Sequence, residues 1–298
     1  MDAESLRAFL AVADAESVTT AAAMLRRPQP TISRTISRLE RELGRELFDR
    51  VGRTVQLNQH GRAFLPHART ALAELETGLE MVQGIDDPEQ GSIRLGFLHS
   101  LGAWLVPDIL QAFRAEAPRI RFQLRQAAAG AIIDMLKRRD LDLILTGPRP
   151  DDESLRWQQL HTQQLMVVAE PGHPLVAAAA GSANGTVSLR DVVRYPYLAM
   201  TPGHGMRTLT DRLLSADGLQ PCVEFEGTDI ETLRGLAGAG LGVAIVPKAH
   251  FSHGAATVEL PLEGADSHRD LGVAWLDGSL QSPVVQRFFT FVRRHPIR

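Results

Sequence analysis

The stretch from Ser17 to Arg62 limits the possible folds of this chain more than any other part. It reads S-V-T-T-A-A-A-M-L, R-R-P-Q-P and T-I-S-R-T-I-S-R-L-E-R-E-L-G, and it closes with L-F-D-R-V-G-R-T-V-Q-L-N-Q-H-G-R. If Gln29 opens a helix, one face of that helix carries Ile32, Ile36, Leu39 and Leu43 at helical spacing. This order predicts two short helices with a tight connection and a small hairpin after them, the outline of a winged helix-turn-helix that reads DNA.

The opposite face of that predicted helix carries Thr31, Arg34 and Arg38, which no core claims. Between Arg26 and Arg62, nine arginines stand against four acids, a net of 9 − 4 = +5 in a chain of formal net charge −3. Positive charge gathered in this way is what contact with DNA phosphates requires. We expect Arg34, Arg38 and Arg53 to contact DNA because they lie on the free face or the wing rather than beside acids. For the arginines farther along the helix, a solvated face with Glu–Arg pairs remains an alternative.

With these residues in place, the amino-terminal part of the chain resembles the DNA-binding domain of LysR-type transcriptional regulators, and the rest of the chain fits that family. Gln29, Pro30, Ser33 and Arg34 match the Q-P-x-x-S-R at the start of the family's recognition helix. The turn and wing match at Leu47, Phe48, Arg50, Gly52, Arg53, Gln56 and Leu57. The chain departs from the family at Pro28, where a capping Ser is usual, and at Asn58 and His60, where Thr and Ala are common.

The resemblance implies a sequence-specific, DNA-binding transcriptional regulator. Seven residues are expected at the DNA interface, namely Gln29, Pro30, Thr31, Ser33, Arg34, Arg38 and Arg53. Gln29 and Ser33, at the amino end of the helix, are better placed for base edges. The arginines farther along are better placed to hold phosphates, which positions the protein without specifying sequence.

Residues 59–84 predict a long helix whose only proline is Pro66. An approximate heptad seam runs along it through Phe64, Ala68, Ala71, Leu75 and Val82, with Leu72 and Leu79 beside it. Such a helix either packs on its own chain or pairs with the same helix of a second subunit. The second reading is favoured because the family dimerises through this linker helix. A homodimer or homotetramer with paired recognition helices predicts an inverted-repeat operator in double-stranded DNA.

From Ser92 onward, predicted strands and helices alternate, which indicates an α/β domain with mostly parallel sheets. The predicted fold class is therefore α/β, with an N-terminal winged helix-turn-helix, a long linker helix and a C-terminal effector domain. Two α/β subdomains joined by crossing strands resemble the periplasmic-binding-protein fold that the family's effector domain shares. The expected boundaries are 1–58 for the DNA-binding domain, 59–90 for the linker helix and hinge, and 91–298 for the effector domain, with subdomain I at 91–161 and 268–298 and subdomain II at 162–267.

Ligands of open α/β sheets bind outside the carboxyl ends of strands, where helix amino termini present free N–H groups. The residues expected there are Ser100, Leu101, Gly102, Thr146, Gly147, Thr201, Pro202, Gly203, Thr228 and Val246. Ser100 and Thr201 are the first choices for hydrogen bonds to a small organic metabolite, with a carboxylate held by amide groups rather than by an ion pair. Taken singly, Ser100, Thr201 and Thr228 are better explained as helix caps, and only their convergence on one cleft favours an effector site. Asp229 argues against a strongly anionic ligand nearby.

A catalytic function is disfavoured. The ten histidines form neither an H-E-x-x-H pattern nor a metal-ligand spacing with cysteine, and no G-x-S-x-G elbow is present. No catalytic residue, metal or cofactor is therefore expected. Two other functions stay open, namely a constitutive or architectural DNA-binding protein whose second domain only assembles oligomers and, far less favoured, a solute-binding protein for transport.

The amino terminus, M-D-A-E-S-L-R, lacks the basic region and the apolar run of a signal peptide. The longest weakly polar run, residues 235–247, is shorter than the ~20 residues that span a bilayer. We therefore expect a cytoplasmic protein with no membrane partner. The single cysteine, Cys222, cannot form an internal disulfide and is expected to be a buried structural thiol.

Overall fold

The computed structural model describes residues 1–298 except 52–53, 87–89, 183, 251–256, 265 and 298. The chain divides into two compact units: Met1–Pro88 with Gln281–Pro283, and Glu89–Leu280 with Val284–Arg298. Three hydrophobic cores support these units, one in the first and two in the second.

The first unit contains the helices α1 (Ala3–Ala15), α2 (Val18–Met24), α3 (Gln29–Leu43) and α4 (Gln59–Asp86) and the strands β1 (Phe48–Val51) and β2 (Thr54–Leu57). Phe9 of α1 is fully buried at its centre, with its ring centroid 5.4 Å from that of Phe48 and 5.2 Å from that of Phe64. One aromatic side chain therefore joins α1 to the hairpin and to α4. Ser17 caps α2 by accepting a hydrogen bond from the N–H of Thr20.

Helix α3 begins at Gln29, as the sequence predicts, after a Pro28 that makes no side-chain cap. Ile32, Ile36 and Leu39 of the predicted apolar face are buried, but Leu43 is 38% exposed. The core side of the helix ends at Leu39, one turn before Gly44 terminates the helix with a positive φ of 67°. The prediction that Leu43 belongs to the packed face is therefore wrong.

The predicted hairpin is confirmed as the antiparallel pair β1–β2, in which Phe48 pairs with Leu57 and Val51 with Thr54. Asn58 then caps α4, since its Oδ1 accepts a 2.9 Å hydrogen bond from the N–H of Gly61. Gly61 lies so close to the carbonyl oxygen of Leu47 that a Cβ there would overlap it. A side chain at this junction is therefore excluded by the backbone of the preceding turn.

Helix α4 has two different halves. Its first half packs on its own unit, where Ala68, Leu72 and Ala73 are buried. Its second half leaves three apolar side chains uncovered in this chain, namely Leu75 and Val82 of the predicted seam, at 46% and 63% exposed, and the adjacent Leu79, at 51% exposed. Contacts within this chain therefore cover the apolar side chains of the first half of α4 only.

The second unit begins with β3 (Gly91–Leu98), a short 3-10 turn (His99–Leu101), α5 (Leu105–Glu116), β4 (Ile120–Ala127), α6 (Ala129–Lys137) and β5 (Leu143–Thr146). The last helix, α11 (Pro283–Arg294), packs on the same core, where the ring centroids of Phe113 and Phe288 lie 4.9 Å apart. Helix α5 begins at Leu105, after the 3-10 turn that Gly102 terminates.

The other core of this unit is built by α7 (Pro174–Gly181), α8 (Leu189–Val192), β7 (Tyr197–Met200), α9 (Gly205–Ala216), β8 (Val223–Gly227), α10 (Ile230–Gly238), β9 (Ala244–Pro247) and β10 (Val258–Pro261). Cys222, just before β8, is exposed, so the expectation of a buried thiol is wrong. Cys222 directly precedes the strand β8, most of whose residues are exposed to solvent.

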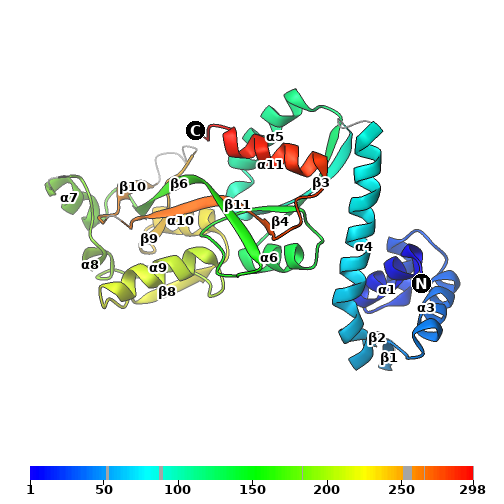
Figure 1. Ribbon diagram of the computed structural model, residues 1–298. Helices are drawn as coiled ribbons and strands as arrows, with labels where there is room; N and C mark the ends of the chain where they lie inside the picture. Colours follow the sequence, from blue (N-terminus) through cyan, green and yellow to red (C-terminus); the bar gives the residue numbers. More distant parts are fainter. Residues whose placement is uncertain (52–53, 87–89, 183, 251–256, 265, 298) are drawn as a thin grey trace. The chain divides into compact units, whose positions relative to one another are not determined.

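Two long strands, β6 (Leu155–Ala169) and β11 (His268–Leu276), run side by side between the two cores (Figure 1). Strands β4, β3 and β5 pair in parallel, but β11 is antiparallel to both β5 and β6, and β6 is antiparallel to β9 and β10. The expectation of mostly parallel sheets is therefore wrong, because β6 and β11 pair antiparallel with each other and with strands of both cores. Arg269 and Gln163 pair across these strands at the point where one core gives way to the other.

Candidate nucleic-acid interface and ligand cleft

The amino end of α3 presents the residues expected at DNA base edges. Gln29 and Pro30 are exposed, Thr31 and Ser33 are half-buried, and the Nε2 of Gln29 donates a 3.2 Å hydrogen bond to the Oγ of Ser33. Arg34 is exposed and makes no hydrogen bond or ion pair with any residue that the structure describes. Its guanidinium is therefore fully available to an external anion.

Arg38 lies on the same helix but in a different situation. Its Nη2 donates to the Oδ2 of Asp2 at 2.8 Å and to the Oγ of Ser5 at 3.0 Å. The pKa of Asp2 is lowered, first by its hydrogen bonds with Ser5 and then by the positive charge of Arg38. The prediction that Arg38 stands away from acids is therefore wrong, because the start of α1 folds back onto it. Arg53 lies outside the described residues.

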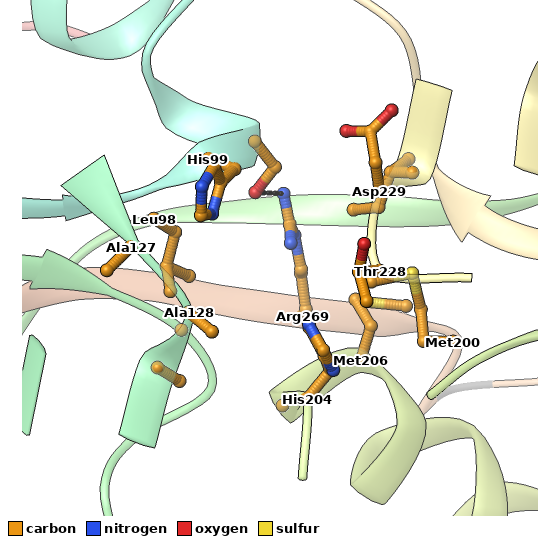
Figure 2. Close-up of a pocket in the computed structure, with 15 residues that line it drawn as sticks. Leu98, His99, Ala127, Ala128, Met200, His204, Met206, Thr228, Asp229 and Arg269 are labelled. Carbon is orange, nitrogen blue, oxygen red and sulfur yellow. Dashed lines mark hydrogen bonds between the residues drawn. The ribbon is translucent and has the colours of Figure 1, made fainter. Parts of the chain in front are cut away.

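A cleft in the second unit separates the two cores, with an internal volume of about 40 Å³. Arg269 stands at its centre between two walls (Figure 2). One wall includes Leu98, His99, Ala127 and Ala128, and the opposite wall includes Met200, Met206, Thr228 and Asp229. Apolar side chains therefore enclose most of the space in front of one cationic group.

Three of the ten residues expected to bind a ligand line this cleft, namely Ser100, Gly147 and Thr228. Leu101 and Val246 are instead buried in the two cores, and Thr146 is buried on β5 opposite Gly272. The side chains of these three residues therefore do not line the cleft, and their role at a ligand site stays a prediction. The remaining residues, Gly102, Thr201, Pro202 and Gly203, line neither this cleft nor the second cavity described below.

Arg269, which the sequence reasoning missed, is the most unusual residue of the cleft. It is 3% exposed, and its Nε donates a 2.8 Å hydrogen bond to the Oε1 of Gln163. Its Nη2 donates to the Oγ of Ser100 at 3.3 Å, and its Nη1 has no partner among the described residues. No carboxylate of those residues lies within ion-pair distance of the guanidinium. Burial without an opposite charge lowers the pKa of Arg269 to about 9.

Strand alternation offered a signal for this arginine. Arg269 and Leu271 are two residues apart on β11, so their side chains point to the same face, and Leu271 is fully buried. Gln163 relates in the same way to the buried Leu165 on β6. Polar residues at inward positions of two paired strands indicate a buried polar site.

A second cavity, which we name the Trp104 cavity, has an internal volume of about 130 Å³. It shares five lining residues with the cleft, namely His99, Ser100, Asp229, Ile230 and Arg269. Its other walls include Trp104 and His250, whose rings stack with centroids 3.4 Å apart and an interplanar angle of 13°. Burial lowers the pKa of His250, and the positive charges of His161, Arg269 and Lys248 lower it further.

The described residues contain no group of three or more His, Cys, Asp or Glu side chains that could hold a metal ion. Among the helices in the described part of the chain, none combines the length and the apolar character needed to cross a bilayer.

Comparison with known proteins gives consistent matches over both units. Residues 86–296 match the family model of the LysR substrate binding domain, and residues 3–62 match that of the bacterial regulatory helix-turn-helix protein, lysR family. The chain is 34% identical to the HTH-type transcriptional regulator YybE of Bacillus subtilis (strain 168) over 295 residues, 99% of each chain. It is 32% identical to the transcriptional dual regulator GltC of the same organism over 295 residues, 98% of this chain and 96% of that protein.

A further similar solved structure contains an organic ligand. It is the effector binding domain of QuiR in complex with shikimate, which matches with a TM-score of 0.63 and 27% identity. The match covers 69% of this chain and 96% of that chain.

Proposed function

This chain belongs to the LysR family of DNA-binding transcriptional regulators, which join a helix-turn-helix domain to an effector-binding domain, and from that premise we propose how it works. It is a cytoplasmic homodimer or homotetramer that binds an inverted-repeat operator in double-stranded DNA. Its affinity for the operator changes when a small organic carboxylate binds in the cleft. It has no catalytic function.

The observation that carries the carboxylate is the uncompensated charge of Arg269. Burying a guanidinium without an opposite charge costs several kcal/mol, and a bound anion offsets that cost. The free Nη1 and the adjacent Nη2 form the planar fork that matches a carboxylate. This arrangement replaces the sequence-based proposal of amide groups alone with an ion pair. The shikimate held by the effector domain of QuiR is itself a carboxylate, which supports the same chemistry here.

Two features support the oligomer and the operator. The second half of α4 exposes Leu75, Leu79 and Val82 at heptad-like positions, and a second copy of α4 would cover them. A two-fold pair of α3 helices then requires two half-sites related by the same symmetry. On this proposal Gln29 and Ser33 face base edges, and Arg34 contacts the DNA backbone.

The domain division proposed from the sequence remains part of this proposal, with the DNA-binding domain at 1–58, the linker helix and hinge at 59–90 and the effector domain at 91–298. The two separate cores of the second unit support subdomains at 91–161 with 268–298 and at 162–267. The long strands β6 and β11 would be the connections about which these subdomains move.

The test uses the full-length chain and duplex DNA from its own gene neighbourhood. A panel of small carboxylates is screened for a rise in melting temperature, and each stabilising compound is then tested for a change in DNA affinity and footprint. We expect a dimer or tetramer, protection of two symmetric half-sites and at least one carboxylate that alters this protection. A chain that binds the duplex but responds to no carboxylate would instead be a constitutive regulator.

A further inference from the structure

The Trp104 cavity contains the same buried guanidinium as the cleft but offers more space. The cleft, at about 40 Å³, holds only a few atoms, whereas the Trp104 cavity measures about 130 Å³. A cavity of roughly 150 Å³ holds a benzene molecule. By this measure a single six-membered ring fits the Trp104 cavity with little room to spare, and the cleft offers much less space for it.

The walls of the Trp104 cavity suit a flat group. Trp104 is fixed by a 2.9 Å hydrogen bond from its Nε1 to the carbonyl oxygen of Ser100 and by its stack with His250. Burial and the neighbouring positive charges lower the pKa of His250, so its imidazole stays neutral near pH 7. Neutral aromatic faces attract planar rings by stacking or edge contacts.

The charges around the cavity favour an anion. Lys248 lines it, is exposed and forms no ion pair with any described residue. Arg234 is 3% exposed and pairs with Glu259, while its Nη2 donates a 2.6 Å hydrogen bond to the carbonyl oxygen of Pro247. Arg234 therefore holds in place the segment that carries Lys248 and His250.

The two acids of the cavity are already engaged. Asp229 caps α10 by accepting hydrogen bonds from the N–H and the Oγ1 of Thr232, at 2.9 and 3.1 Å. Glu231 lies 3.6 Å from the Nε of Arg234. Neither acid forms an ion pair with Arg269, so the charge of Arg269 is left for a ligand.

We infer that the Trp104 cavity is a ring-binding compartment of the effector site, built for a carboxylate with a single six-membered ring. The carboxylate pairs with the Nη1 and Nη2 of Arg269 while the ring lies beside Trp104 and His250, and the cleft receives only small substituents. This inference rests on the proposed function, because it assigns the class of effector and the compartment that holds it.

The experiment measures binding to the full-length chain by titration calorimetry. Benzoate, cyclohexanecarboxylate and shikimate are the ring carboxylates, and benzamide and cyclohexanecarboxamide are uncharged counterparts of nearly the same shape. Acetate, pyruvate and succinate represent acyclic carboxylates. We expect at least one ring carboxylate to bind at least ten-fold more tightly than its amide and than any acyclic acid.

Two matched substitutions locate the ring. Ala103→Leu adds three carbons to the Trp104 cavity at an exposed position, and Ala128→Leu adds the same volume to the cleft. We expect Ala103→Leu to weaken ring-carboxylate binding at least ten-fold, and Ala128→Leu to weaken it less. The opposite order would place the ring in the cleft and overturn the inference, although the proposed function would stand.

Arg269→Gln tests the charge, and Arg190→Gln, at an exposed position of α8, is the control for the same chemical change. We expect Arg269→Gln to abolish the preference for benzoate over benzamide and Arg190→Gln to preserve it. If Arg269→Gln does not fold, the Ala103→Leu arm still decides. Binding of acyclic acids only would overturn this inference alone, whereas binding of no carboxylate at all would overturn the effector proposal as well.

Discussion

Arg34 and Arg38 lie one helical turn apart, and their surroundings predict different effects when each is replaced by alanine. Arg34 has no partner among the described residues, whereas Arg38 is held by Asp2 and Ser5. Arg34→Ala therefore removes a cation that is free to neutralise a phosphate. Since the side chain is exposed, we expect the stability of the fold to change by no more than about 0.5 kcal/mol.

The size of the effect follows from counting charges. Each phosphate contact contributes about 0.9 to the slope of log affinity against log salt concentration, so two copies in a dimer contribute about 1.8. A four-fold rise in salt should therefore lower the ratio of wild-type to Arg34→Ala operator affinity roughly 12-fold. Arg38→Ala should change the slope by less than half as much, because Asp2 already compensates that charge. It should instead lower the melting temperature of the first unit, since the capped start of α1 loses a partner.

The assay is fluorescence anisotropy of a labelled operator duplex over a salt series, with the melting temperature of each variant measured in parallel. Wild type and both variants are compared at the same duplex sequence. An unchanged slope for Arg34→Ala, or equal slopes for the two variants, would contradict the assignment of a free and a tied arginine.

Two further predictions address the junction before α4 and the histidines of the second unit. Gly61→Ala should destabilise the first unit by about 2–4 kcal/mol in chemical denaturation, because the new Cβ overlaps the carbonyl of Leu47 and disturbs the Asn58 cap. Gly235→Ala, which meets nothing within 4 Å in α10, should instead stabilise the second unit by up to about 1 kcal/mol, and equal losses at both sites would contradict this reasoning. The pKa values of His161 and His250 are lowered from 6.5, chiefly by burial, so below pH 6.5 the unfolded chain binds more protons than the folded chain. The melting temperature of the second unit should then decrease as the pH is lowered from about 7.5 to about 5.5. This decrease should be smaller in the His161→Gln, His250→Gln double variant.

The sequence predicted the helical elements of the first unit closely because each depends on neighbours along the chain. The start of α3 at Gln29 and the Asn58 cap of α4 are set by residues within a few positions. The reversal of β11 was missed because an antiparallel pairing between residues more than a hundred positions apart leaves no mark in local periodicity. The burial of Leu101 and Val246 in the two cores could not be foreseen for a related reason, since only the assembled sheets show which side chains the cores enclose.

The ligand cleft shows the same limit more sharply. The hydroxyl residues Ser100 and Thr228 could be predicted because they follow strand ends. The position of Arg269 in the same cleft could not be predicted in that way. Strand alternation could have marked Arg269 as an inward polar residue, but its place in the cleft depends on a contact with Ser100, 169 positions away.

Three arginines of this chain are chemically identical and are used in three ways. Arg34 is solvated and free, Arg38 is tied to Asp2, and Arg269 is buried without an opposite charge. A solvated arginine costs nothing to keep charged, so it serves an external anion whose binding depends strongly on salt. A buried arginine has already lost its water, so an anion that reaches it regains much of that cost, and salt screens the pair far less. Operator binding should therefore weaken steeply as salt rises, while carboxylate binding to the effector domain should change little over the same range.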